Sequence, residues 1–423
     1  MANCKSCGAV LREGAKFCTQ CGTAVVKNIF CSQCGVKLEE GDKFCYACGA
    51  AVKTAEAARP VPVKNENEYP AWQSFAALWD VRSMLSVGAG SPEGHYLSNE
   101  YGNEVFRVAE DGVEAERIER PEGVLAFYSK LWKNGRLWLT ALMEGEENTT
   151  HLQRLYTYTP AEGFKVALDV SQAEYGDLEI VRFIVTELCV FLYCYNSKRR
   201  KDHVSLMTCA LDGNGLREVW AGEDFVLRGA GQDRLYMVCE GSEGKREVLV
   251  ISADGSVKNA ADVLAEQLGI IAGGLGVEPG ETAEERGDFC WKYIPFIDFS
   301  EGVIYAALDE GGTENLTRQV FRIGFGESEL KSQGVKWQLG DIDPTENFRE
   351  YFDGSRAVGF TYDSPGCWTA LHSDGSRVKL GEGNYWDGGA VLGDYFYLDC
   401  RGSEPGAWYK ISLKDGSRRK IEF

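Results

Sequence analysis

The chain has 423 residues, 44% of them apolar, so it exceeds one ordinary domain and has enough apolar side chains to bury a sizeable core. It carries 64 acidic and 45 basic side chains, which gives a net charge of −19. A field of this sign disfavours adsorption to nucleic acid or to an anionic membrane. No run approaches the length of apolar sequence that a membrane span requires, so we expect none.

Two pairs of closely spaced cysteines open the chain, and the same arrangement recurs 27 residues later. A two-residue spacer curls the backbone so that both sulfurs face one metal ion, and two such pairs at this separation are typical of a tetrahedral zinc site. A glycine follows each pair and suits the tight turn. The eight candidate ligands are Cys4, Cys7, Cys18, Cys21, Cys31, Cys34, Cys45 and Cys48.

This cysteine block, about residues 3–53, resembles the tandem or double zinc ribbons of bacterial and archaeal proteins. The resemblance implies one zinc ion on the first four cysteines and a second zinc ion on the last four. A disulfide framework is the alternative, and the lack of an apolar signal segment at the start disfavours it. Four thiolates leave no open position on a zinc ion, so we expect both sites to be structural.

Composition divides the chain into four parts. We expect the first ribbon over residues 1–27, the second over residues 28–53, and a linker rich in Ala, Pro, Glu and Asn over residues 54–68. Residues 69–423 hold 57 acidic and 36 basic side chains, so the negative charge lies there.

Residues 69–423 consist of short runs of aromatic and β-branched residues at period two, which is the signature of strands. Hairpin turns of the Asp-Gly type recur at intervals of about 40–50 residues, with one wider gap. They are Asp111-Gly112, Glu162-Gly163, Asp212-Gly213, Asp254-Gly255, Gly324–Gly326, Asp374-Gly375 and Asp415-Gly416. One four-stranded unit per 40–50 residues is the period of a β-propeller blade, so the sequence predicts a mainly β fold with about seven blades.

The region resembles divergent bacterial propellers of unknown function and, loosely, the TolB-type propellers. Two stacked β-sandwiches are the alternative arrangement of the same strands. Val81–Val87 is a candidate closing strand. The wide gap contains the one predicted helix, Asn259–Gly269, followed by a polar, glycine-rich insertion around Gly273–Gly287.

No catalytic or cofactor-binding motif is present. The histidines have no metal-binding spacing, and we interpret them as solvated loop residues: His95, His151, His203 and His372. Ala272–Gly276 lacks the lysine of a phosphate loop, so we interpret it as flexible. Acidic pairs such as Asp341/Asp343 and Asp298/Glu301 are expected by chance among 64 acids. The remaining cysteines are interpreted as buried small hydrophobes in a reducing cytosol: Cys189, Cys194, Cys209, Cys239, Cys290, Cys367 and Cys400.

The sequence therefore predicts a cytoplasmic, non-enzymatic scaffold in which zinc ribbons are tethered to an acidic propeller that binds a protein, a peptide or a small ligand. Nucleic acid is a disfavoured partner because the metal-loaded ribbons are nearly neutral and the densest basic cluster, Lys198–Lys201, lies in an apparent hairpin tip. The alternatives are an enzyme with a site in the propeller channel and nucleic-acid binding by the ribbons. The sequence does not indicate the oligomeric state.

Overall fold

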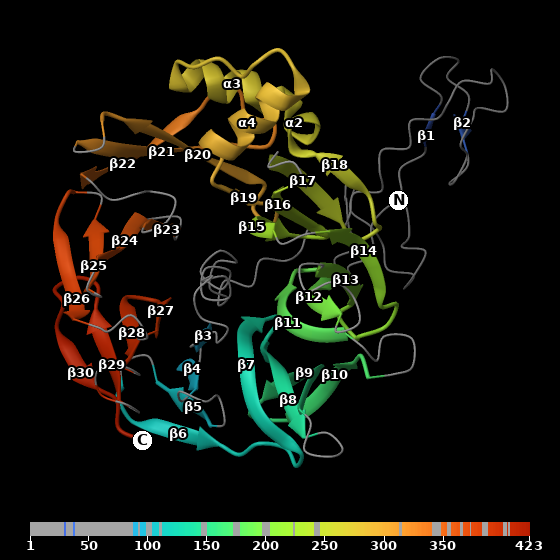
Figure 1. Ribbon diagram of the computed structural model, residues 1–423, viewed down its shortest axis with the longest axis vertical. Coiled ribbons are helices and arrows are strands. Elements are labelled where there is room, and N and C mark those ends of the chain that lie inside the picture. Colours follow the sequence, from blue (N-terminus) through green and yellow to red (C-terminus); the bar gives the residue numbers. More distant parts are fainter. Residues whose placement is uncertain are drawn as a thin grey trace, which may run out of the picture. The chain divides into compact units, whose positions relative to one another are not determined.

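The computed structural model of the protein describes residues 29–30, residues 37–38 and, with short gaps, residues 88–423 (Figure 1). The chain divides into two compact units, Met1–Val63 and Lys64–Phe423. The boundary between the units falls within the predicted linker, residues 54–68. That linker and the candidate closing strand Val81–Val87 lie outside the described residues, so their predicted structure stays a prediction.

The second unit contains seven four-stranded antiparallel groups, which we call blades 1 to 7 in chain order. Blade 1 consists of β3 (Gly88–Ser91), β4 (Gly94–Ser98), β5 (Val105–Val108) and β6 (Ala115–Ile118). Blade 2 consists of β7 (Val124–Lys133), β8 (Arg136–Glu144), β9 (Thr150–Thr159) and β10 (Gly163–Asp169). Blade 3 consists of β11 (Leu178–Val185), β12 (Cys189–Asn196), β13 (Val204–Ala210) and β14 (Arg217–Gly222). Blade 4 consists of β15 (Phe225–Gly231), β16 (Arg234–Glu240), β17 (Arg246–Ser252) and β18 (Val257–Asn259).

Three helices separate blade 4 from the remaining blades: α2 (Ala260–Val263), α3 (Ala265–Leu275) and α4 (Ala283–Tyr293). Blade 5 consists of β19 (Phe296–Asp298), β20 (Val303–Glu310), β21 (Leu316–Gly324) and β22 (Lys331–Gly340). Blade 6 consists of β23 (Phe348–Phe352), β24 (Ala357–Asp363), β25 (Cys367–His372) and β26 (Arg377–Glu382). Blade 7 consists of β27 (Gly388–Leu392), β28 (Tyr395–Asp399), β29 (Trp408–Ser412) and β30 (Arg418–Lys420).

The blades form a ring, with the first strand of each blade toward the centre and the fourth strand outside (Figure 1). Within each blade the strands pair in sequence order. The first strands of neighbouring blades lie close together, as β27, β3, β7 and β11 show in turn. The predicted mainly β fold with about seven blades is therefore confirmed, and the alternative of two stacked sandwiches is wrong.

Each of the seven predicted turns joins the third and fourth strands of one blade. Six of their glycines have a positive φ, between 69° and 87°, which a residue with a Cβ adopts only under strain. In the Asp-Gly turns at Asp212, Asp254, Asp374 and Asp415, the carboxylate accepts the N–H of the residue two positions later, at 2.9–3.0 Å. Hydrogen bonds from Ser417 and its neighbours lower the pKa of Asp415 to about 2.

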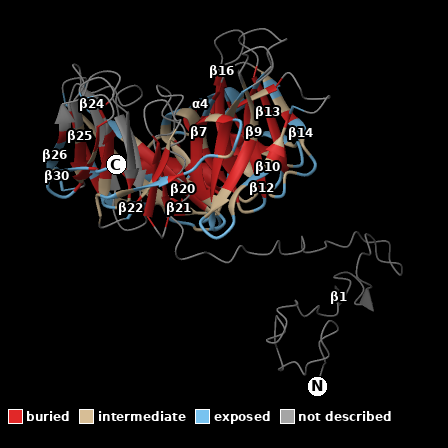
Figure 2. Cartoon of the chain, turned by 90° about the horizontal axis from the view of Figure 1, so that it is seen from below, coloured by how far each residue is buried: buried red, intermediate tan, exposed pale blue. Residues whose placement is uncertain are grey.

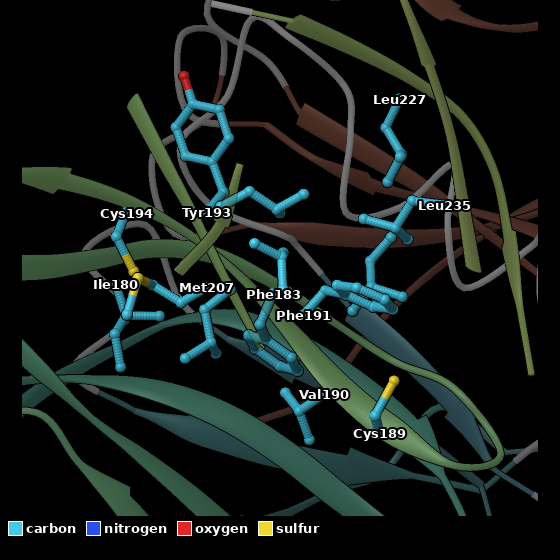
Figure 3. Packing of buried hydrophobic residues seen from close by; sticks show 14 of the residues in the cluster. Ile180, Phe183, Cys189, Val190, Phe191, Tyr193, Cys194, Met207, Leu227 and Leu235 are labelled. Atoms are coloured by element: carbon cyan, nitrogen blue, oxygen red, sulfur yellow. The ribbon is translucent and has the colours of Figure 1, made fainter. Parts of the chain in front are cut away.

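The core lies between the faces of adjacent blades, and the strands of the ring are largely buried (Figure 2). One apolar cluster extends from Leu131 in blade 2, through blade 3, to Ile251 in blade 4. Cys189 to Cys194 of β12 are all buried, so both faces of this strand are covered. Figure 3 shows Phe183 and Phe191 of blade 3 facing Leu235 of blade 4.

The predicted helix is present as α2 and α3, but the interpretation of Ala272–Gly276 as a flexible insertion is wrong. Ala272–Gly276 forms the end of α3, where Gly276 is the left-handed cap with φ 70°. The sequence analysis also missed α4. Its start carries a capping box, in which the Thr282 side chain accepts the Glu285 N–H and the Glu285 side chain accepts the Thr282 N–H.

The helices pack between blades 4 and 5. Side chains from β16, β17, α3, α4, β19 and β20 share one apolar cluster. Tyr236 of β16 donates a hydrogen bond to the carbonyl oxygens of Cys290 (3.2 Å) and Ile294 (3.1 Å). At the centre of the ring, β15 pairs in parallel with β19, and this pairing joins the two blades into one eight-stranded sheet.

Two glycines of β15 permit the parallel pairing. A Cβ on Gly229 would lie 2.2 Å from Ile297 O, and a Cβ on Gly231 would lie 2.3 Å from Ser300 N. Both distances are shorter than non-bonded atoms tolerate, so only glycine fits this close approach.

No helix among the described residues combines the length and apolar character needed to traverse a bilayer.

Substituting alanine at two turn glycines should separate backbone strain from blade packing. Gly213 and Gly255 occupy the same turn with φ of 82° and 87°, but only at Gly213 would a Cβ meet backbone, 2.0 Å from Ala167 O. We expect Gly255→Ala to lower the free energy of unfolding by about 1–2 kcal/mol and Gly213→Ala by about 1–3 kcal/mol more. Urea denaturation followed by circular dichroism measures both; equal losses would contradict the packing of this turn on blade 2.

Candidate functional site

The described part of the N-terminal unit is a short hairpin. β1 (Ile29–Phe30) pairs antiparallel with β2 (Lys37–Leu38), with Ile29 opposite Leu38. The six-residue connection between the strands contains Cys31 and Cys34. This pairing brings the two ends of the cysteine-containing connection together, as a chain that turns back around a metal ion requires.

The eight predicted ligands, Cys4 to Cys48, lie outside the described residues, so the zinc assignment to these positions stays a prediction. The hairpin and the donor set fit zinc, because thiolates in two C-x2-C pairs supply the four soft ligands of a structural site. Zinc bound there would hold the fold together, since the side chains available to each ribbon are too few for a core of their own.

Polar residues from four blades meet at Glu187, in the turn between β11 and β12. Its carboxylate lies 3.0 Å from Lys133 Nζ of blade 2. It accepts the Gln232 N–H of blade 4 at 2.5 Å and the Ser300 hydroxyl of blade 5 at 2.8 Å. Glu187 therefore connects the first turns of four consecutive blades.

Burial by itself would raise the pKa of Glu187, but the charge of Lys133 and the hydrogen bonds from Ser300 and Gln232 outweigh it and lower the pKa. Asp298 lies nearby and is 4% exposed. Its burial, assisted by the negative charges of Glu301 and Glu187, raises its pKa to about 6. One oxygen of Asp298 accepts the N–H groups of Ser300 and Glu301 and so shapes its own turn.

Two buried lysines lie at other blade boundaries. Lys130 Nζ of blade 2 donates to the Ser98 hydroxyl of blade 1 at 2.7 Å. Lys410 Nζ of blade 7 donates to Gly112 O of blade 1 at 3.2 Å and lies 4.1 Å from the centre of the Tyr395 ring. The sequence analysis missed these lysines and Glu187. Lys130 could have been recognised from the sequence, because a charged residue within an otherwise apolar strand indicates a buried, paired charge.

The histidines do not share one environment. His95 is fully buried on β4, with its ring 5.0 Å from that of Tyr397 and edge-on to it, so its interpretation as a solvated loop residue is wrong. Burial, followed by the charge of Lys410, lowers the pKa of His95 to about 3. His372 Nε2 of blade 6 lies 2.8 Å from Leu413 O of blade 7. His151 and His372 are half-buried on β9 and β25, so their interpretation as solvated loop residues is wrong as well, and His203 lies outside the described residues.

The described propeller cysteines are buried thiols, as predicted: Cys189, Cys194, Cys209, Cys239, Cys290 and Cys400. Burial raises the pKa of Cys239 to about 11 and those of Cys209 and Cys290 to about 12. A thiol is a nucleophile only as the thiolate, so these groups are unreactive at neutral pH. The side chain of Cys367 lies outside the described residues.

The remaining sequence candidates form no described site. Among the described residues, no three His, Cys, Asp or Glu side chains are grouped so that they could hold a metal ion. A cavity of about 10 Å³ between blades 3 and 4 has room for about one water molecule, and its lining is aromatic and aliphatic. Asp341/Asp343 and Lys198–Lys201 lie outside the described residues.

Comparison with known families decides the nature of the cysteine block. The model of the Double zinc ribbon family matches residues 4–54. Residues 4–54 therefore match a double zinc ribbon in sequence. The matched residues include all eight predicted ligands of the double zinc ribbon. No curated protein matches the sequence.

The propeller resembles several solved structures at low sequence identity. The β-propeller domain of the Trilobed protease from Pyrococcus furiosus is 9% identical, over 81% of this chain and 98% of that chain, with a TM-score of 0.44. A putative TolB from Agrobacterium tumefaciens is 10% identical, over 73% and 84%, with a TM-score of 0.31. A puromycin-hydrolyzing peptidase from Mycobacterium tuberculosis is 12% identical, over 75% and 49%, with a TM-score of 0.37. This chain thus spans about half the length of that peptidase.

The burial of neutral His95 should make the propeller sensitive to mild acid. The pKa of His95 is about 3 in the folded protein and 6.5 ordinarily, so unfolding takes up a proton below pH 6.5. Stability is therefore complete above pH 6.5 and falls toward pH 3, by up to about 1.4 kcal/mol per pH unit. We expect His95→Phe to flatten the dependence of the unfolding free energy on pH between 6.5 and 4.5.

Chemical denaturation at a series of pH values measures this slope. Asp298 contributes in the opposite sense, because its raised folded pKa of about 6 makes protonation below pH 6 stabilising. Asp298→Asn, which keeps an acceptor oxygen for its turn, should therefore steepen the fall. An unchanged slope in His95→Phe would show that His95 is not neutral in the folded protein.

Proposed function

We propose that this chain is a zinc-stabilised binding protein, in which a double zinc ribbon with two structural zinc ions is joined to an acidic propeller that engages a protein or peptide. The observation that carries the proposal is how the charged groups around Glu187 are paired. Lys133 pairs with Glu187, and Glu187 accepts hydrogen bonds from the turns of blades 4 and 5, so these groups are occupied in holding the ring together.

Two further observations favour binding over catalysis. The thiols of Cys194, Cys209 and Cys290 are protonated at neutral pH, because burial raises their pKa values. The pKa of the Asp298 carboxyl group is raised to about 6, and this group accepts hydrogen bonds from two N–H groups of its own turn. Its hydrogen bonds support a structural role. A four-thiolate zinc site likewise offers no open position to a substrate.

The charge of the propeller region sets the chemistry of its partner. Residues 69–423 hold 57 acidic and 36 basic side chains, which favours association with a basic protein segment or a small cationic ligand and opposes phosphate backbones. Buried thiols that form no disulfide, together with the predicted thiolate zinc sites, favour a reducing compartment, and we therefore propose a cytoplasmic location.

Removing one ligand should empty one zinc site only. In Cys18→Ser the hydroxyl stays protonated and is a poor ligand, so we expect about one zinc ion per chain where the wild type holds about two. Binding of zinc supplies about 10–16 kcal/mol in comparable small sites, so the first ribbon should unfold with the loss of its metal. Thr19→Ala, in the same cysteine pair, is the matched control and should retain both ions.

Metal analysis of the purified full chain gives the zinc content, and a thermal melt reports on the propeller. The propeller has its own apolar core, so its melting temperature should be the same in Cys18→Ser as in the wild type. Loss of both ions in Cys18→Ser would mean that the ligands of the two sites are interleaved.

The same charge argument predicts weak binding of nucleic acid. We expect fluorescence anisotropy with generic single-stranded and duplex oligonucleotides to show no sub-micromolar binding at about 150 mM salt. A basic peptide of matched length should bind more tightly, and its affinity should fall as salt is raised. Sub-micromolar nucleic-acid binding that disappears when residues 1–53 are deleted would replace the proposal with a ribbon-mediated nucleic-acid function.

A further inference from the structure

The last turn of α4 carries an indole ring over which two arginine side chains lie. The Cζ atom of Arg228 is 3.9 Å from the centre of the Trp291 ring, and the Cζ atom of Arg246 is 4.5 Å from it. Arg228 belongs to β15 and Arg246 to β17, so blade 4 supplies both guanidinium groups and the helical insertion supplies the ring. Lys292 follows Trp291, and its Nζ lies 4.9 Å from the centre of the Tyr293 ring. We call Arg228, Arg246, Trp291 and Lys292 the Trp291 corner.

A β-bulge sets the direction of Arg228. The register of β15 against β16 shifts at this residue, so Arg228 is an extra residue in β15, and a bulge of this kind re-aims a side chain. Arg228 Nη1 donates a hydrogen bond to Trp291 O at 2.7 Å, which holds this guanidinium group against α4. Arg228 is half-buried, whereas Arg246 and Lys292 are exposed. The Trp291 corner therefore combines one anchored cation with two exposed cations.

The end of the helix explains one of these three cations. The C-terminal turn of a helix carries a partial negative charge of about half an elementary charge, and a cation that bonds one of its carbonyl oxygens is stabilised there. Arg228 has this role through its bond to Trp291 O. Half a negative charge is too little to account for Arg246 and Lys292 as well. Their position at the same helix end therefore indicates a second use of the positive charge.

Two guanidinium groups on one ring are arranged to bind a single anion. A guanidinium group carries five N–H donors in a rigid fork, and its contact with the indole ring fixes where that fork lies. Such forks match the oxygen atoms of carboxylate and phosphate groups. Both Cζ atoms lie within 4.5 Å of one ring centre, so an anion with several oxygen atoms can contact Arg228 and Arg246 together.

The number of positive charges distinguishes between the possible anions. A carboxylate has one negative charge and two oxygen atoms, which a single fork occupies. A phosphate monoester has a charge of about −1.5 to −2 at pH 7 and three acceptor oxygens, so the three cations can share it. A phosphodiester has one charge, and a chain of diesters is also repelled by the acidic propeller region. The Trp291 corner therefore suits a compact phosphate monoester better than a carboxylate or a nucleic-acid backbone.

We propose that the Trp291 corner binds a phosphate monoester group, carried by a small molecule or by a phosphorylated side chain. Arg228 and Arg246 contact the phosphate oxygens through their forks, and Lys292 adds a third positive charge. Trp291 is a positioning residue, because it holds both guanidinium groups without contacting the ligand. This site is independent of the proposed engagement of a basic protein segment, since it has the opposite charge and uses different residues.

Isothermal titration calorimetry of the full chain with methyl phosphate tests the proposal. We expect saturable binding with a Kd below about 1 mM. Dimethyl phosphate and acetate, which each carry one charge, should bind at least about tenfold more weakly. A phosphoserine peptide of otherwise uncharged sequence distinguishes the two sources of the monoester. Tighter binding of the peptide than of methyl phosphate supports a phosphorylated protein segment, and equal binding supports a small molecule.

Substitutions at exposed arginines locate the site. Arg246→Gln removes one fork and should weaken binding of methyl phosphate about tenfold to a hundredfold, as expected for the loss of charge-assisted hydrogen bonds. Arg246→Lys keeps the charge without the fork and should have a smaller effect. Arg136→Gln, at an exposed position in blade 2, changes the net charge equally and is the matched control. Its Kd should stay within about twofold of the wild-type value.

Thermal melts of the same variants show whether they are folded, which the exposure of both side chains leads us to expect. The proposal is overturned if methyl phosphate does not bind the wild type, or if dimethyl phosphate or acetate binds as tightly. It is also overturned if folded Arg246→Gln binds methyl phosphate as well as Arg136→Gln does, because Arg246 would then serve only the fold.

Discussion

A four-stranded sheet that is apolar on both faces cannot be stable alone, and this constraint governs the propeller. Blade 3 shows it most clearly, because β12 is buried along its length from Cys189 to Cys194. Burying a large apolar side chain contributes about 1.5–3 kcal/mol, so an uncovered blade face would forfeit several such contributions. Each blade therefore needs a neighbour on both sides. A ring supplies two neighbours to every blade, and a stack leaves two end faces open.

The burial of charge follows from the same geometry. The first turns of blades 2, 3, 4 and 5 meet at Glu187, whose side chain is only 11% exposed. The Glu187 carboxylate forms an ion pair with Lys133 and accepts hydrogen bonds from the Gln232 N–H and the Ser300 hydroxyl. Removing one partner of such a network would leave a buried charge uncompensated, so the network fixes the spacing of the blades more than it adds net stability. Charged side chains that hold a ring in this way are committed to structure.

The helical insertion changes how two blades meet. In the rest of the described ring, blade faces pack on one another, whereas α2, α3 and α4 enter between blades 4 and 5 and share a cluster with both. Their outer strands are thereby separated, and contact is kept at the centre through the ladder between β15 and β19. Gly229 and Gly231 make that approach possible, since any Cβ there would overlap backbone atoms of β19 and its following turn. The contact between blades 4 and 5 at the centre of the ring depends on these two positions.

The sequence by itself determined the features that depend on local chemistry. Metal-ligand spacing is local, so the double zinc ribbon was evident from Cys4 to Cys48. Turn chemistry is local too: Asp415-Gly416 and its relatives mark the outer hairpins because the carboxylate bonds an N–H two residues away and glycine accepts positive φ. Their period gave the blade count. The same reasoning failed at α4, where a capping box at Thr282 was overlooked among polar residues.

Only the tertiary structure decided which residues are buried by partners distant in sequence. His95 lies beside Tyr397 and near Lys410, about three hundred positions later in the chain, so no window of sequence could show that its imidazole is buried. The network at Glu187, the close approach at Gly229 and the bridge between Glu114 and Glu422 have the same origin. Each joins separate blades, and the distance between blades is set by how the ring closes, which local propensity does not encode.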